Sequence, residues 1–389
     1  MADILSNGIA AQICQPTLSR HGGKLPPQKS QKLLHKVIES LKENIDCPPI
    51  DVTTMLSNTI TLPDIPAIAG LSFRHILGEQ DADAIYALRA ACVERDHVDL
   101  LSSSEGLPSR DGMRDALRHI VVAQQQQQRL VAQINDQVVG YSIVESWHES
   151  DGRWVYLILG WVLPQWRGRG IGTAMLHWGE QTARQLAAAQ HPNEPLEFAA
   201  NANSTQPEST ALLLREGYYV GYTVLEMQLD NSALQPPQPL PAGIEIRPAL
   251  PEHYPLIAAS IGEAYRNEYA GGRFQEEWHL QDSITRLSAA RQDPTLWQIA
   301  WAGDQVVGQV LPLIEKGRAH LYDVSVRSAW RRRGLARALL TRGLHRVRER
   351  GIEVIRLNTV AEFPTRAKDL YYSVGFRLMK EFPRYRKSP

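Results

Sequence analysis

Two apolar runs predict long buried strands, and each is followed by a turn and then by residues with a helical period. The runs are WVYLILGWV (Trp154–Val162) and AHLYDVSV (Ala319–Val326). The helices are expected at about Gly172–Ala188 and Ala336–Gly351. The same strand, turn and helix thus occur twice, in the middle and near the end of the chain.

This similarity extends along both parts of the chain and predicts a duplicated domain. Matching segments occur in the same order in both copies. The distance between the two members of a matching pair shrinks from 173 to 158 residues along the chain, so the second copy has slightly shorter loops. Four pairs match: Phe73-Arg74 with Ile246-Arg247, DQVVGYSIV (136–144) with DQVVGQVLP (304–312), WRGRG (166–170) with WRRRG (330–334), and LLLREGY (212–218) with LYYSVGF (370–376).

Each copy is predicted to be an α+β domain. Its expected order is strand, helical region, hairpin, long strand, arginine-glycine turn, helix, strand, helix and strand, which gives a mixed, mostly antiparallel sheet flanked by helices. We place the first domain at 70–230 and the second at 244–389. Between them, 231–243 contains four prolines and is predicted to be a linker.

Residues 1–65 form an N-terminal extension of different character. Its first 30 residues are rich in Pro, Gln, Ser and Gly, which predicts partial disorder. Residues 30–45 have the apolar spacing of one helix, either docked on the body, part of a mobile extension, or used to bind a partner. Met55 is an alternative start of translation.

Bulk composition narrows the function classes. The 389 residues suit two domains, and the 42 basic residues balance the 42 acidic ones, so no general attraction to nucleic acid or anionic membranes is expected. The three cysteines are far apart, which argues against a disulfide framework and against a metal site. Without a signal-like start or a spanning apolar run, the chain is expected to be soluble and cytoplasmic.

The arginine-glycine turns have the chemistry of a diphosphate cradle. A helix start leaves N–H groups without partners and carries partial positive charge, glycine allows close approach, and arginine adds charged donors. The alternative is a solvated basic turn that only begins a helix. The expected ligand-binding residues are Arg167, Gly168, Arg169, Gly170 and Gly172 in the first copy, and Arg331, Arg332, Arg333, Gly334 and Ala336 in the second.

These motifs resemble the acetyl-CoA signature of the GCN5-related N-acetyltransferase (GNAT) superfamily. VLPQWRGRGIG (162–172) matches it, VRSAWRRRGLA (326–336) matches it with serine in place of proline, and Ala367–Phe376 is similar to the superfamily's closing helix and strand. The resemblance covers about 71–387. The tandem arrangement resembles two-domain acetyltransferases of the mycothiol synthase type.

The resemblance implies an acetyl transfer from acetyl-CoA to a primary amine, with no metal and no covalent enzyme intermediate. Backbone groups near Val324 and Val326 would hold the pantetheine arm. Tyr371 stands at the superfamily's usual acid position, and tyrosine, which normally titrates near pH 10, can donate a proton at neutral pH. His320 is the candidate base. Asp323, Glu315 or a water chain are the alternatives for that role.

The first copy departs from the pattern at the acid position, where Leu213 cannot donate a proton. By residue count, Tyr156 stands at the place of His320. We therefore expect the second copy to catalyse and the first to bind acetyl-CoA weakly or to be structural. An asparagine that is usual before the closing helix is replaced by Glu208 and Pro364, which puts the normal pantetheine contact in doubt.

Two other functions stay open at this point. One is a non-catalytic acyl-CoA-binding or sensory protein, and the other is a protein-modifying acetyltransferase that works within a complex. A small-molecule amine is the expected partner, and the superfamily's acceptors range from aminoglycosides and polyamines to amino-sugar thiols, amino acids and protein amines.

Overall fold

The computed structural model describes residues 59–149, 151–266, 280–289, 292–315 and 317–389. The helix expected at 30–45, Met55 and most of the predicted extension lie outside the described residues. The first copy contains these elements, after a short β1 (Thr59–Ile60): β2 (Leu71–His75), α4 (Ala82–Arg95), α5 (Arg110–Val122), β3 (Arg129–Ile134), β4 (Gln137–His148), β5 (Trp154–Val162), α6 (Ile171–Gln190), β6 (Leu196–Asn201), α7 (Pro207–Arg215) and β7 (Tyr219–Leu229).

The second copy repeats this order after the proline-rich segment. Its elements are β8 (Glu245–Arg247), α8 (Tyr254–Tyr265), α9 (Leu280–Leu287), β9 (Gln298–Ala302), β10 (Gln305–Glu315), β11 (Arg318–Val326), α10 (Leu335–Glu349), β12 (Ile355–Val360), α11 (Ala367–Ser373) and β13 (Phe376–Lys387). The predicted α+β class, with helices flanking a mixed sheet, is confirmed.

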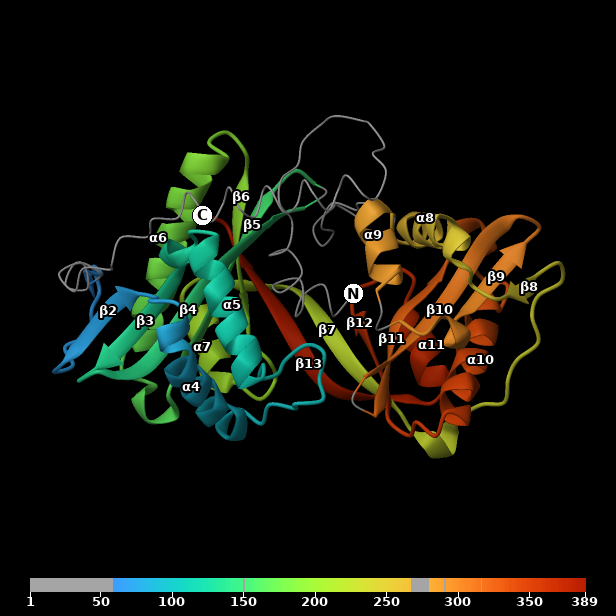
Figure 1. The fold of residues 1–389 in the computed structure, drawn as a ribbon, viewed down its shortest axis with the longest axis horizontal. Helices are drawn as coiled ribbons and strands as arrows, with labels where there is room; N and C mark the ends of the chain where they lie inside the picture. The colour runs from blue at the N-terminus through green and yellow to red at the C-terminus, as the bar shows by residue number, and fades with distance from the viewer. Residues whose placement is uncertain (1–58, 150, 267–279, 290–291, 316) are drawn as a thin grey trace, which may run out of the picture.

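The strands of both copies form one sheet because the two copies exchange their last strands. The order along the described sheet is β1-β2-β3-β4-β5-β6-β13-β7-β12-β11-β10-β9-β8. The final strand of the second copy, β13, therefore pairs with β6 of the first, and β7 pairs with β12 of the second. Figure 1 shows β7 and β13 side by side across the middle of the molecule, with the C-terminus in the half built from the first copy.

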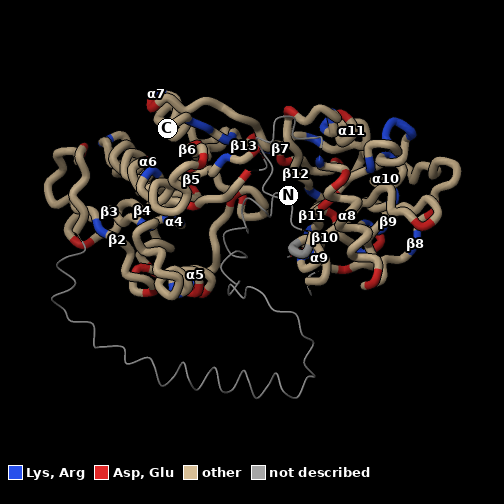
Figure 2. The backbone as a smooth tube through the Cα atoms, turned by 90° about the horizontal axis from the view of Figure 1, so that it is seen from above, with Lys and Arg blue, Asp and Glu red and all other residues tan. Residues whose placement is uncertain are grey.

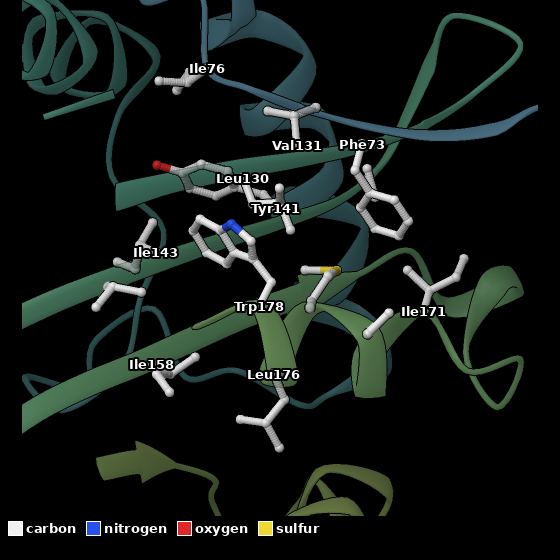
Figure 3. Close-up of a cluster of buried hydrophobic side chains, with 14 of the residues drawn as sticks. Phe73, Ile76, Leu130, Val131, Tyr141, Ile143, Ile158, Ile171, Leu176 and Trp178 are labelled. Atoms are coloured by element: carbon white, nitrogen blue, oxygen red, sulfur yellow. The ribbon is translucent and has the colours of Figure 1, made fainter. Parts of the chain in front are cut away.

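Each half has its own apolar core, to which its long helix contributes one face. In the first half, Met175 and Trp178 of α6 belong to the same cluster as Leu130 and Ile158 of the sheet, and Figure 3 shows Trp178 pointing toward the strands. In the second half, α10 supplies Leu339, Leu340 and Leu344 to a cluster that also includes Met227 of the exchanged β7 and Phe376 of β13. The second core is thus completed by a strand of the first copy.

Charged residues are interspersed over both halves. Figure 2 shows Lys and Arg as well as Asp and Glu scattered over both halves, which agrees with the balanced composition. In the described part of the chain, no helix combines the length and the apolar character that crossing a membrane requires.

Candidate active site

The turn before each long helix has the same left-handed backbone in both copies. Gly170 begins α6 with φ 89°, and Gly334 begins α10 with φ 81°. Two residues earlier, Gly168 has φ 72° and Arg332 has φ 61°. Glycine adopts such angles without strain, whereas Arg332 is held there by the turn. The glycine pattern in the sequence is therefore used for backbone shape.

This backbone shape leaves a row of N–H groups without an acceptor in the described part of the chain. Among the described residues, the N–H groups of 168–173 and of 332–337 donate to no backbone or side-chain acceptor, and intrahelical bonding starts only where Ala174 donates to Gly170 and Ala338 to Gly334. Each turn thus presents consecutive donors together with the positive end of a helix. A diphosphate satisfies both, so the residues present fit the expected ligand.

The first arginine of each motif points inward. Arg167 donates from Nε to the carbonyl of Val162 (3.0 Å) and from both terminal nitrogens to the buried carboxylate of Asp96 (2.5 and 2.8 Å). Arg331 donates from Nε to the carbonyl of Val326 (3.0 Å) and from a terminal nitrogen to the carbonyl of Ala264 (2.6 Å). These two guanidinium groups tie the turn to the strand before it. The backbone N–H groups of Arg167 and Arg331 donate to the carbonyls of Pro164 and Ser328, so the donors left for a ligand begin one residue later.

The third arginine of each motif covers the tryptophan that precedes it. The guanidinium carbon of Arg169 lies 4.8 Å from the ring centre of Trp166, and that of Arg333 lies 4.8 Å from the ring centre of Trp330. Both tryptophans pack against the cores beneath the turns. Arg169, Arg332 and Arg333 are exposed, so their charges border the two cradles.

The long strand of the second copy separates from its neighbour close to the cradle. The β11–β12 ladder contains only two pairs, Ala319 with Ile355 and His320 with Arg356, although both strands continue. In the first copy, β5 and β6 pair over five residues, from Trp154 to Ile158. The backbone of β11 up to Val324 and Val326 therefore borders a gap on the side of β12, where an extended pantetheine arm can add hydrogen bonds.

A β-bulge in β11 accompanies this opening. Leu311 of β10 pairs with Asp323 whereas Pro312 pairs with Leu321, which leaves Tyr322 as the extra residue. The β4–β5 ladder of the first copy has no such shift. A proline within a strand is typical of edges and bulges, so Pro312 was the signal in the sequence that could have predicted this feature.

The bulge also changes which residues correspond between the two copies. By residue count, Tyr156 was predicted to be the first-copy equivalent of His320, and this prediction was wrong. The extra residue shifts the match by one, so Leu157 takes the place of His320. Tyr156 is buried in the core beside α6, whereas Leu157 belongs to a small cluster separate from that core. The first copy thus lacks a titratable side chain at both expected catalytic positions.

His320 and Tyr371 lie on opposite faces of the second half's sheet. Ala319 and Leu321 belong to the core beneath α10, so His320 between them points to the other face. Tyr371 is packed in that core, with its ring centre 6.0 Å from that of Phe376 and 6% of its surface exposed. Tyr372 is 40% exposed, as expected for its neighbour on a helix. A thioester in the gap between β11 and β12 would meet the two groups from opposite sides.

A buried polar network lies on the same side as His320. The Asp323 carboxylate accepts from the Ser325 hydroxyl (2.7 Å), which in turn accepts from the Gln309 amide (2.5 Å). Burial raises the pKa of Asp323, while bonds from Ser325, Tyr265 and Gln309 oppose that rise. Asp323 is therefore a second titratable group on the same side of the sheet as His320.

A loop of the first copy reaches the second copy beside His320. Asp99 accepts from Arg356 (2.6 Å), Ser104 accepts from Asn358 (2.6 Å), and Glu105 binds Lys380 (2.7 Å). Arg356 is the register partner of His320. The strand exchange brings these residues together, and neither their spacing nor their motifs in the sequence indicated it.

In the described part of the chain, no group of three or more His, Cys, Asp or Glu side chains is arranged to hold a metal ion.

Comparison with known proteins identifies the family. The model of the acetyltransferase (GNAT) family matches residues 95–196 and 258–376, once in each copy. The chain belongs to the GNAT acetyltransferase family. It is an N-acetyltransferase with two GNAT regions in tandem, and members of this family use acetyl-CoA as acetyl donor. The predicted resemblance, fold class and enzyme class are confirmed.

Curated relatives match most of the chain. A mycothiol acetyltransferase of Kineococcus radiotolerans is 28% identical over 310 residues, which cover 76% of this chain and 93% of the relative. A second mycothiol acetyltransferase, of a Parafrankia species, is 27% identical over 344 residues, covering 80% and 96%.

Solved structures share the fold. A GCN5-related N-acetyltransferase of Sphaerobacter thermophilus matches with a TM-score of 0.64 and 24% identity, over 84% of this chain and 97% of that one. A tandem GNAT protein from the clavulanic acid biosynthesis pathway matches with a TM-score of 0.53 and 14% identity, over 82% and 98%.

Proposed function

We propose that the second copy transfers the acetyl group of acetyl-CoA to a primary amine of a small molecule, and that the first copy has lost this chemistry. The observation that carries the proposal is the placement of Tyr371. It is buried in the same core cluster as Leu321 and Leu357, which directly follow the last paired residues of β11 and β12. The first copy has Leu213 on the matching helix.

Each part of the second copy has a task in this scheme. The free N–H groups of 332–337 hold the diphosphate, and Arg333 adds positive charge at its edge. The open side of β11, near Val324 and Val326, aligns the pantetheine arm. Acetyl-CoA supplies an acetyl group activated as a thioester. Holding it beside the amine removes much of the entropic cost of bringing two reactants together.

Proton transfers complete the reaction. The attacking nitrogen forms a bond to the acetyl carbon while the carbon–sulfur bond breaks. His320 takes the proton that the amine loses, directly or through water, with Asp323 as the alternative acceptor. The Tyr371 hydroxyl gives a proton to the departing sulfur. General acid catalysis of this kind contributes about 10² to 10⁴-fold.

The acceptor class rests on the relatives. Proteins 27% and 28% identical to this chain are named for mycothiol, a small molecule, and they are matched over nearly their whole length. We therefore propose a small-molecule primary amine rather than a protein amine. The first domain (70–230), the linker (231–243) and the second domain (244–389) remain the proposed division of the chain, with β7 and β13 exchanged between the domains.

Replacing Tyr371 tests the catalytic assignment. Thiol release from acetyl-CoA would be measured with a panel of small amines for the wild type, Tyr371→Phe and the neighbouring control Tyr372→Phe. We expect Tyr371→Phe to lower kcat by about 10²-fold or more because the departing sulfur loses its acid, with acetyl-CoA affinity retained. Tyr372→Phe is expected to match the wild type.

A third variant separates the two copies. Leu213→Ala in the first copy should leave turnover largely intact as long as the fold survives. Loss of turnover in Leu213→Ala but not in Tyr371→Phe would place the chemistry in the first copy. Binding of acetyl-CoA by the wild type without turnover of any amine would favour the non-catalytic, sensory alternative.

A further inference from the structure

Asn358 lies at the edge of the gap between β11 and β12. It is two residues past Arg356, the last paired residue of β12, which places it about 7 Å farther along the strand. Ile355 and Leu357 belong to the core beneath α10, so the residues that alternate with them, Arg356 and Asn358, point to the opposite face. His320 points to that same face. Asn358 therefore borders the gap on the side of the candidate base.

The side-chain amide of Asn358 is held at its nitrogen and lacks a partner at its oxygen. Nδ2 donates to the hydroxyl of Ser104, which belongs to the first copy (2.6 Å). Oδ1 is buried and accepts no hydrogen bond in the described part of the chain. A buried acceptor without a donor costs free energy. At the edge of a reaction site, such an acceptor indicates a donor that the ligand supplies.

The loop that supplies Ser104 is braced on several sides. We call residues 97–106 the crossing loop, and Figure 1 shows the connection between α4 and α5, which contains it, extending toward β13. Glu105 of this loop accepts from Lys380 of β13 (2.7 Å) and from the Asn203 amide (2.7 Å). A hydroxyl held in this way orients its partner before a ligand arrives, so less ordering is needed when the ligand binds.

The crossing loop also compensates the positive charge beside His320. Arg356, the register partner of His320, donates to the carboxylate of Asp99 in the loop (2.6 Å). Partial burial opposes ionisation of Asp99, but bonds from the Leu101 N–H and from Arg356 outweigh it and lower the pKa of this carboxyl. A primary amine is mostly protonated at neutral pH, and an uncompensated guanidinium would repel it. The ion pair removes that repulsion.

The first copy contains an asparagine at the equivalent place. Leu157, the counterpart of His320, pairs with Ala199, so Asn201 two residues later is the counterpart of Asn358. Leu157 cannot take a proton, and Asn201 therefore stands beside a gap that has no candidate base. The two asparagines form a matched pair, in which only the one in the second copy is expected to affect the reaction.

We propose that Asn358 accepts a hydrogen bond from the attacking amine, and that Ser104 of the first copy positions Asn358 for this contact. The inference rests on the proposed function. The attacking nitrogen of a primary amine carries two N–H groups. One loses its proton to His320 as the bond to the acetyl carbon forms, while the other donates to Oδ1 of Asn358 and becomes the N–H of the product amide.

This contact makes the site selective for primary amines. A secondary amine has one N–H group, which the reaction removes, so no N–H remains for Oδ1 of Asn358. A site that is built to accept a hydrogen bond from its substrate discriminates against an analogue that lacks the donor, because its buried acceptor then stays without a partner. The second copy's site is thus completed by a residue of the first copy.

Selectivity between a primary amine and its N-methyl derivative tests this role. The probes are the most active primary amine of the panel described above and its N-methyl derivative, with kcat/KM measured for the full chain at saturating acetyl-CoA. We expect the wild type to prefer the primary amine by about tenfold or more. Asn358→Ala should lose most of this preference and keep the wild-type KM for acetyl-CoA. The matched control Asn201→Ala should keep the preference.

A second pair of variants tests the positioning by the first copy. Ser104→Ala should lower kcat/KM for the primary amine about threefold or more, because the amide of Asn358 can then turn, whereas Ser104→Thr keeps the hydroxyl and should stay near the wild-type value. Circular dichroism would verify that the variants are folded.

The outcomes separate this inference from the proposed function. Wild-type selectivity in a folded Asn358→Ala variant, or a wild-type kcat/KM in a folded Ser104→Ala variant, would overturn the inference. Either result would leave the proposed function intact, since Tyr371→Phe tests that function independently. A wild type that acetylates no amine would overturn the proposed function and this inference with it.

Discussion

The side chains around Arg167 show how one residue type serves different purposes within a single motif. The Arg167 side chain stabilises the turn by donating to the Asp96 carboxylate and the Val162 carbonyl, whereas Arg169 lies at the surface. The side chain of Asp96 is only 3% exposed, and it also accepts a bond from Gln206 (3.3 Å). Removing one partner of a buried pair leaves the other charge without compensation.

We therefore expect Asp96→Ala to destabilise the protein by about 3–5 kcal/mol, because Arg167 would stay buried without its carboxylate. Thermal or urea unfolding of the full chain measures this loss. Glu208→Gln is the matched control, since it breaks the exposed Arg95–Glu208 pair (51% and 45% exposed) and should cost at most about 1 kcal/mol. Equal losses in the two variants would contradict a structural role for the Arg167 side chain.

At the residue level, the closing-helix motif pointed to Tyr371 as the acid. The structure buries Tyr371 and exposes its neighbour Tyr372, while the catalytic role of Tyr371 stays a prediction. Prediction failed where the partner is distant in sequence: nothing near Arg167 indicated Asp96, which lies 71 positions earlier. The role of His320 as a base stays a prediction. The predicted equivalence of Tyr156 and His320 was wrong, because β11 contains one extra residue.

At the scale of single elements, the bulge in β11 is the clearest difference between the copies. Pro312 follows the register shift, and Val144 occupies its position in β4, whose pairing with β5 has no shift. We expect Pro312→Val to lower kcat about tenfold or more, because the restored N–H favours regular pairing and misplaces the residues around the gap. Steady-state kinetics and unfolding midpoints would be measured together. Unchanged kcat in a folded variant would contradict a catalytic role for the bulge.

The elements themselves were largely predictable, since they depend on local periodicity. The helices expected at about 172–188 and 336–351 are observed as Ile171–Gln190 and Leu335–Glu349. Their starts follow from the left-handed glycine immediately before each helix. The bulge was not predicted because the apolar pattern of AHLYDVSV indicates one continuous strand. Only Pro312, on the neighbouring strand, indicates the irregularity.

At the scale of the whole molecule, the strand exchange was beyond sequence reasoning. The alternation of apolar residues in β7 and β13 predicts two strands but does not say which sheet each one joins. Duplicated copies offer similar edges, so the last strand of either copy fits beside β6 or β12. The exchange makes Met227 of the first copy part of the second core, and it brings Asp99 to Arg356 beside His320. The two copies are therefore one structural unit.

The most direct measurement of the central claim is the KM for acetyl-CoA in Arg333→Glu compared with Arg346→Glu. Both substitutions reverse one exposed charge on or beside α10, the first at the cradle and the second in the last turn of the helix. If the second cradle serves the reaction, Arg333→Glu raises KM about tenfold or more through lost diphosphate contacts, and Arg346→Glu leaves KM near the wild-type value. An unchanged KM in Arg333→Glu, or an equal rise in both variants, would contradict the account.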